Sequence, residues 1–388
     1  MNRVVNGLRV LDLSRLLPGP FAAQMLLHYG AEVIKIEDTG AGDYARDLHP
    51  LPASGFGAAF TASNRGKQSL AIDLKQPAGV AAFLALAREA DVVLESFRPG
   101  VMDRLGVGWE VLHAAAPRLV YCAITGYGQH TRQAALAGHD LNYQGYAGLL
   151  HRDGPPAMPT ALVADLVGGS MSAVIAIQAA LLERERTGQG RFIDLSITHS
   201  VMALHALTAA HHFGGADASS ARARHGGSHP AYRCYETADQ RHVTLAALEP
   251  KFWNRFCELA GCPELRGDPT QHDPAKTNTT LNALFRAHTL AEWTRRAEAW
   301  DVCIGPVLTP EEALDAAVAD GLPLFAHFAH QPNAALGGPG PQREVRVLSG
   351  APADLARPAP SPCPPPPRHG QQGPAGAFAQ GLVARQAV

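Results

Sequence analysis

The stretch LRVLDLSRLLPGPFAAQMLLHYGAEVIKIE, residues 8–37, decides the fold of this chain. Residues 8–13 have the apolar character of a short buried strand, 21–29 form a helical pattern that ends at a glycine, and 32–37 repeat the strand pattern. Short connections between a strand, a helix and a second strand are typical of a parallel sheet. The glycine fingerprint of dinucleotide-binding turns is absent, because Pro-Gly-Pro occupies positions 18–20. The stretch therefore predicts a doubly wound α/β fold and gives little support to a nicotinamide site.

The alternation of strands and helices continues along the chain. We expect strands at 70–74, 91–95, 119–124 and 192–197, and helices at 77–89 and 166–184. In an open sheet of this kind, ligands bind beyond the carboxyl ends of the strands. Lys67, Lys75, Arg98 and the loop at Gly126 fall at or near such ends. They predict a cradle for the phosphates of a nucleotide tail, and solvated surface cations are the open alternative.

The composition changes after residue 213. Residues 214–227 are rich in Gly, Ala, Ser and Arg, which predicts a linker. From His229 onward, strand patterns that suit an antiparallel hairpin are mixed with helical patterns, as in a small α+β domain. From Gln331 the chain is rich in Pro and Gly, which predicts an extended, exposed end.

The overall composition excludes several classes of protein. The chain has 388 residues, enough for two domains, and Lys plus Arg (33) nearly balances Asp plus Glu (35), so no nucleic-acid footprint is expected. Six cysteines form no CxxC pair, which argues against a zinc or redox site. We see no signal peptide and expect no apolar run that spans a bilayer, so we expect a soluble cytoplasmic protein.

The stretch AGHDLNYQGY, residues 137–146, holds the first candidate catalytic groups. His139 and Asp140 are adjacent, and a nearby carboxylate favours the imidazolium form and fixes the tautomer of a histidine. Asp165 follows in LVADLVGGSM, where an Asp within an apolar run either caps a helix or does chemistry. Glu249 ends a strand before a helix, and helix capping is the simpler interpretation of it. A structural role for His139 and a pure N-cap role for Asp165 stay open.

Other chemistries have weaker support. His199, His205, His211 and His212 lack the spacing and the interleaved carboxylate of a metal site. Ser14 and Ser170 lack the context of a nucleophile elbow, so a serine hydrolase is not expected.

Ten segments, taken in order, resemble one superfamily. They are GLRVLDLS, PGPFAAQMLLHYGAEVIKIE, LAIDLKQPAG, FRPGVMDRLG, ITGYGQ, AGHDLNY, LVADLVGGSM, RTGQGRFIDLSI, YETADQRHVTLAALEPKFW and CIGPVL, between Gly7 and Leu308. The chain is thereby similar to the class III CoA transferases and α-methylacyl-CoA racemases, the CaiB/BaiF-like proteins, and more strongly to the racemases.

The resemblance implies a Rossmann-like α/β large domain with an inserted small α+β domain. We expect the large, CoA-binding domain at 1–213 and 326–388, a linker at 214–228 and the small domain at 229–325. It also implies an interlocked homodimer, with the active site between the large domain of one chain and the small domain of its partner. The ligand would be an acyl-CoA thioester, and no cofactor is implied beyond the CoA of the substrate.

Two mechanisms occur on this scaffold. In the racemases, the residues matching His139 and Asp165 are the two bases that invert the α carbon of a 2-methylacyl-CoA, and the Glu matching Glu249 supports the histidine. The backbone amides at helix ends would hold the enolate oxygen. The alternative is CoA transfer between carboxylic acids, with Asp140 attacking the thioester to form an anhydride. A CoA-binding protein without catalysis is a third possibility.

The CoA-binding positions follow from the same resemblance, with one addition. Arg98 is added from its place at a strand end. The others are Ile72, Asp73, Leu74 and Lys75 with Gly138, Leu141, Asn142 and Tyr143. One departure bears on the grip on CoA: racemases carry Arg-Pro after the second strand, where this chain has Asp38 and Thr39. The acyl group itself is not predicted.

Overall fold

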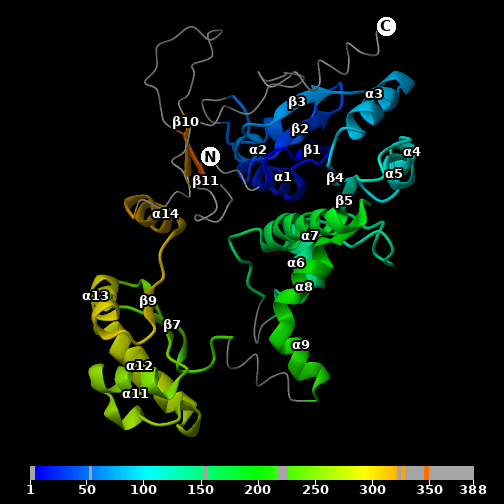
Figure 1. Ribbon diagram of the computed structural model, residues 1–388. Coiled ribbons are helices and arrows are strands. Elements are labelled where there is room, and N and C mark those ends of the chain that lie inside the picture. Colours follow the sequence, from blue (N-terminus) through cyan, green and yellow to red (C-terminus); the bar gives the residue numbers. More distant parts are fainter. Residues whose placement is uncertain are drawn as a thin grey trace, which may run out of the picture. The chain divides into compact units, whose positions relative to one another are not determined.

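A computed structural model describes residues 5–51, 55–151, 156–215, 226–320, 325–328 and 345–348. The chain divides into two compact units, Met1–Ala203 with Ala317–Val388, and Leu204–Ala316 (Figure 1). Much of the predicted linker and nearly all of the proline-rich end lie outside the described residues.

The first unit is built on a six-stranded parallel sheet, as predicted. Its strand order is β3-β2-β1-β4-β5-β6, the doubly wound order of a Rossmann-like sheet. All strands are parallel, and the strand order reverses between β1 and β4. The strands are β1 (Arg9–Asp12), β2 (Glu32–Glu37), β3 (Gln68–Ala71), β4 (Val92–Glu95), β5 (Val120–Thr125) and β6 (Phe192–Ser196).

Helices connect these strands. They are α1 (Pro18–His28), η1 (Tyr44–Asp47), α2 (Ala58–Asn64), α3 (Pro77–Ala87), α4 (Val101–Arg104), α5 (Trp109–Ala115), α6 (Asp140–Tyr146), the π-helix η2 (Ala164–Met171), α7 (Ser172–Thr187) and α8 (Ile197–Met202). A separate antiparallel pair is formed by β10 (Phe325–Phe328) and β11 (Val345–Leu348).

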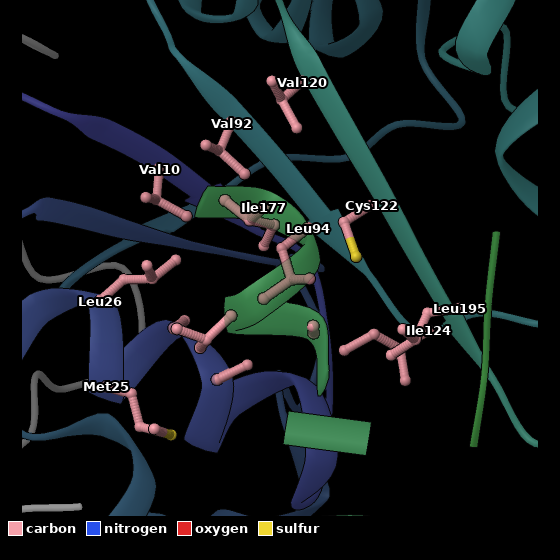
Figure 2. Close-up of a cluster of buried hydrophobic side chains, with 14 of the residues drawn as sticks. Val10, Met25, Leu26, Val92, Leu94, Val120, Cys122, Ile124, Ile177 and Leu195 are labelled. Carbon is pink, nitrogen blue, oxygen red and sulfur yellow. The ribbon is translucent and has the colours of Figure 1, made fainter. Parts of the chain in front are cut away.

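Alternation along the strands separates two hydrophobic cores. Val92 and Leu94 of β4 belong to the core that contains α1 and α7, which Figure 2 shows. Val93, between them, points to the opposite core, with Phe83 of α3 and Leu112 of α5. Because successive side chains of a strand point to opposite faces, each strand contributes to both layers. The sheet is therefore buried on both faces, as parallel sheets are.

One prediction about apolar segments was wrong. The continuous helical segment Ala164–Thr187 has 24 residues and is long and apolar enough to cross a membrane by length and composition. However, Ala173, Val174 and Ile177 are buried against the sheet. The segment is therefore a core helix of the first unit, which agrees with the burial expected for residues 166–184.

The second unit is a three-stranded antiparallel sheet with helices. The sheet has the order β7-β8-β9, and the apolar side chains of Tyr235, Trp253, Phe256, Phe285 and Trp293 fill its core. Its elements are α9 (Ala206–Phe213), β7 (Tyr232–Glu236), β8 (His242–Ala246), α11 (Pro250–Leu259), η4 (Pro263–Leu265), η5 (Pro269–Gln271), α12 (Pro274–Arg286), α13 (Leu290–Trp300) and β9 (Ile304–Pro306); η3 (Ala203–His205) and α14 (Pro310–Ala319) lie at its boundaries.

Buried ion pairs fix the loop that follows β1. The Lys67 ammonium lies 2.8 Å from the Asp12 carboxylate and donates to the carbonyl oxygen of Pro20 at 2.8 Å. The Lys35 ammonium lies 2.9 Å from the Asp43 carboxylate. All four charged side chains are almost completely excluded from solvent. The prediction that Lys67 cradles a phosphate is wrong, because its ammonium group is already neutralised inside the protein.

Candidate active site

The turn into α6 presents His139 at the surface. His139 occupies the N-cap position of α6 in an extended backbone conformation, and its side chain is exposed. Its backbone N–H donates to the Asn142 side-chain oxygen at 3.1 Å. The Asn142 side chain thus caps the start of α6 from within the helix, and the imidazole of His139 is accessible to solvent.

Two glycines make room for the Tyr143 ring beside this turn. A Cβ at Gly126 would lie 2.3 Å from the Tyr143 ring, and one at Gly138 would lie 2.7 Å from it. The Tyr143 hydroxyl donates to the Gly138 carbonyl oxygen at 2.5 Å, and the Tyr127 ring meets the Tyr143 ring edge-on with centroids 5.2 Å apart. The two ends of the loop at residues 126–139 thus pack around the Tyr143 ring, which fixes the backbone at Gly126 and Gly138.

Asp140, the first residue of α6, is buried and held from two sides. Its carboxylate accepts a hydrogen bond from the backbone N–H of Asp165 at 3.0 Å and another from the Gln144 side-chain amide. Only 6 % of Asp140 is exposed. These two donors fix the carboxylate at the point where α6 packs against η2.

Asp165 lies in the π-helical turn Ala164–Met171, whose N-cap is Val163. The alternative that Asp165 is only a helix N-cap is therefore wrong, because Asp165 lies inside the helical segment. Its half-buried carboxylate accepts no hydrogen bond from any residue that the structure describes. Single π-turns within α-helices occur frequently at functional sites.

The environment of Asp165 favours its neutral form. Burial, and then the negative charge of Asp140, raise the pKa of the Asp165 carboxyl to about 7. The same carboxylates, after burial, raise the pKa of the Tyr143 hydroxyl to about 12, so that this group remains a hydrogen-bond donor. A carboxyl that titrates near neutrality exchanges protons in both directions at physiological pH, which is what a general acid–base needs.

The predicted CoA-binding residues outside this loop lie at the carboxyl ends of strands. Ile72, Asp73, Leu74 and Lys75 follow β3, and Arg98 follows β4. Lys75 and Arg98 are exposed, whereas the Ile72 side chain is buried in the core. The cations are therefore available to a ligand, but Ile72 offers only its backbone.

Glu249 belongs to the second unit. It is the N-cap residue of α11, as expected from the sequence, yet its side chain makes no capping hydrogen bond. Its charge, after burial, raises the pKa of the nearby Cys303 thiol. The Glu249 carboxylate is thus not used to cap the helix.

The sequence interpretation missed two residues of the site. Gln144 follows Asp140 by four residues, a spacing at which helical side chains meet, so it was detectable. Ser170, whose hydroxyl donates to the Pro18 carbonyl oxygen at 2.7 Å, gave no signal because the two residues are 152 positions apart. Within the described ranges, no three or more His, Cys, Asp or Glu side chains are grouped to hold a metal ion.

Comparison with known proteins adds four findings. The family model described as CoA-transferase family III matches residues 5–363. The α-methylacyl-CoA racemase of Homo sapiens is 34 % identical over 317 residues, covering 80 % of this chain and 79 % of that protein. The succinyl-CoA:glutarate CoA-transferase of Mus musculus is 33 % identical over 348 residues, covering 87 % and 79 %. A crystal structure of a CAIB/BAIF family protein from Brucella suis superimposes with a TM-score of 0.74 at 26 % identity, covering 100 % and 99 % of the two chains.

Proposed function

This chain is a member of CoA-transferase family III, and from that premise we propose that it is an acyl-CoA racemase that inverts the α carbon of 2-methylacyl-CoA thioesters. Its relatives include racemases and CoA-transferases, and both kinds are enzymes. The names of both relatives refer to CoA thioesters, which supports an acyl-CoA as the substrate and a role in fatty acid metabolism.

Inversion requires one group that removes the α proton and another that returns a proton to the opposite face. The electron pair of the broken C–H bond moves onto the thioester oxygen, and it returns to the α carbon when the second group delivers its proton. We assign these roles to His139 and Asp165, with each acting as the base for one enantiomer. General acid–base groups of this kind contribute roughly 10²–10⁴-fold each to a rate.

The observation that carries the proposal is the state of the Asp165 carboxyl. It is half-buried, it accepts no hydrogen bond within the described part of the chain, and its pKa is raised to about 7. A structural carboxylate is usually paired or hydrogen-bonded, because burial of a charge is otherwise unfavourable. An unengaged carboxyl with near-neutral pKa suits a group reserved for proton transfer.

CoA transfer is the second candidate, favoured by transferase relatives of similar identity. The resemblance to the transferases predicts that Asp140 attacks the thioester. Both donors to the Asp140 carboxylate would have to be given up before it could bond to a substrate carbon. We therefore propose that any anhydride intermediate forms on Asp165 instead, whose carboxylate is not held in this way.

We also propose that the working molecule is an interlocked homodimer to which the partner's small domain brings Glu249. Support comes from large apolar side chains left exposed on each unit, such as Ile175 and Leu182 of α7 in the first and Leu207 and Phe213 of α9 in the second. Exposed apolar surface of this kind favours association with another chain. Light scattering should then give twice the mass of one chain.

Two further parts of the proposal concern conditions and place. We propose that catalysis needs no metal or organic cofactor beyond the CoA of the substrate, so activity should survive dialysis against a chelator. We propose the cytoplasm as the location.

A panel of acyl-CoA thioesters, each with and without acceptor acids, tests the function by mass spectrometry. We expect α-proton exchange with solvent in the absence of any acceptor, lost in His139→Ala and in Asp165→Asn. Transfer of CoA to an acceptor, with an adduct on residue 165 trapped by hydroxylamine, would establish the second candidate instead. Binding of CoA without either reaction would leave a non-catalytic CoA-binding protein.

A further inference from the structure

Asp140 is too enclosed to be a second reactive group. Both oxygens of its carboxylate are engaged, one by the Asp165 backbone N–H at 3.0 Å and the other by the Gln144 amide. Only 2 % of Gln144 is exposed, so water has little access to its amide and does not readily replace Asp140 as the hydrogen-bond acceptor. These two hydrogen bonds hold the Asp140 carboxylate in place.

We propose that Asp140 is a positioning residue: a fixed negative charge, clamped by Gln144, that anchors the backbone of Asp165 and sets the proton affinity of its carboxyl. This inference rests on the proposed proton-transfer role of Asp165. It assigns Asp140 a role without substrate contact and gives Gln144 a function of its own.

The hydrogen bond from Asp165 N–H supplies the anchoring part of this role. A π-turn offers the chain an irregular hydrogen-bond pattern, so its backbone position depends on contacts from outside the turn. Asp140, on α6, provides one such contact. The Ser170 hydroxyl provides another by donating to the carbonyl oxygen of Pro18, the first residue of α1. Asp165 is therefore held between two neighbouring helices.

Electrostatics supplies the second part. The elements packed against η2 are α1, α6, α7, α8 and β6. Their other titratable or charged groups are His28, Tyr143, Tyr146, residues 183–186, Asp194 and His199, together with His139 at the start of α6. After burial, Asp140 is the charge that raises the pKa of Asp165. Removing that charge should make the Asp165 carboxyl more acidic.

Asp140→Asn is the principal test, since it removes the charge and keeps the shape and an oxygen for the Asp165 N–H. The readout is a ¹³C NMR titration of aspartate carboxyl groups, in which the Asp165 signal is identified by its loss in Asp165→Asn. We expect the midpoint of Asp165 to fall by about one pH unit, the effect of one close like charge. Asp194→Asn is the matched control: it removes a carboxylate from β6, which also packs against η2, and should leave the midpoint unchanged.

The titration needs no turnover, so its result is separate from that of the proposed function. A lowered midpoint without α-proton exchange on any thioester would uphold the inference and reject the racemase. An unchanged midpoint in folded Asp140→Asn, or an acyl adduct on Asp140 in the wild type, would overturn the inference.

Gln144→Met keeps the test informative if Asp140→Asn does not fold. Losing this donor frees the Asp140 carboxylate, so the Asp165 backbone N–H that it anchors should exchange faster with solvent deuterium, with Gln24→Met, another buried glutamine of the same unit, as the control. An Asp165 amide that exchanges at the wild-type rate in Gln144→Met would show that Gln144 is not the clamp.

Discussion

The hydroxyl of Ser170 donates a hydrogen bond of 2.7 Å to the carbonyl oxygen of Pro18, and so ties the π-turn of Asp165 to the first turn of α1. The same turn is also held by Lys67, which donates to the carbonyl oxygen of Pro20. A chain of buried polar contacts therefore runs from the sheet to the candidate acid–base group. Its members are open to separate tests.

Ser170→Ala should destabilise the fold and slow the reaction. The change removes the half-buried hydrogen bond between Ser170 and the Pro18 carbonyl oxygen, which costs about 0.5–1.5 kcal/mol. Ser172→Ala is the matched control, because that hydroxyl bonds to Val167 O within the same helical segment and joins no second element. Urea unfolding followed by circular dichroism measures both. Equal losses in the two variants would argue that the link to Pro18 has no special weight.

Lys67→Met should be among the most damaging single changes in the first unit. It leaves the Asp12 carboxylate buried without its partner, and breaking a buried pair on one side costs about 3–5 kcal/mol. Arg118→Ala breaks the exposed pair with Glu185 and should cost less than about 1 kcal/mol. Thermal unfolding of both variants checks this. A Lys67→Met protein as stable as the wild type would show that the buried pair does not organise the loop.

Acid should destabilise the first unit through Glu37. Burial raises the pKa of this carboxyl, but hydrogen bonds from Arg46, Ser69 and the Asp43 backbone outweigh burial and bring it down to about 2. Because the folded-state pKa is depressed, the stabilisation is complete above about pH 4.5 and is lost as pH falls toward 2. Protonation of Glu37 lowers the free energy of unfolding by up to about 3 kcal/mol.

The contribution of Glu37 is isolated by Glu37→Gln. Free energies of unfolding measured between pH 6 and pH 2 should fall less steeply in this variant than in the wild type. Parallel curves for the two proteins would mean that Glu37 is not responsible for the loss.

Gly126→Ala should impair the site with little change in the rest of the fold. The added methyl group would lie 2.3 Å from the Tyr143 ring, so the ring and the loop at Gly138 must shift. Misplacement of catalytic groups by about 1 Å can lower a rate by about 10²-fold. Gly145→Ala serves as the control: it lies on α6, the helix that carries Tyr143, and its added Cβ would meet only one atom, at 3.9 Å. Steady-state rates at saturating thioester distinguish the two variants, and equal rates would contradict the packing argument.

Much of the large unit was predictable from local pattern. β2 was predicted with its observed bounds, Glu32–Glu37, because an apolar run between two turn signals leaves little choice. The carboxyl-end positions of Lys75 and Arg98 followed from the strand order. Asp140 and Asp165 were singled out before their contact was known, but the contact itself depends on the packing of α6 against η2, which no spacing encodes.

The errors have physical causes. The helix that carries Asp165 begins before Leu166, because a π-turn extends it and helical periodicity does not register an extra residue per turn. Lys67 was predicted to bind a phosphate, with solvated surface as the alternative, because its partner, Asp12, is 55 residues away in the sequence. A buried lysine is rare unless it is paired, so only the tertiary structure could reveal the exception.

The measurement that tests the central claim most directly uses one enantiomer of a 2-methylacyl-CoA in deuterated water, without an acceptor acid. We predict that the wild-type protein yields both enantiomers, with one deuterium at the α carbon of the inverted product, and that folded Asp165→Asn yields neither deuterium nor inversion. An unchanged, undeuterated substrate with folded wild-type protein, accompanied by CoA transfer once an acceptor is added, would contradict the claim.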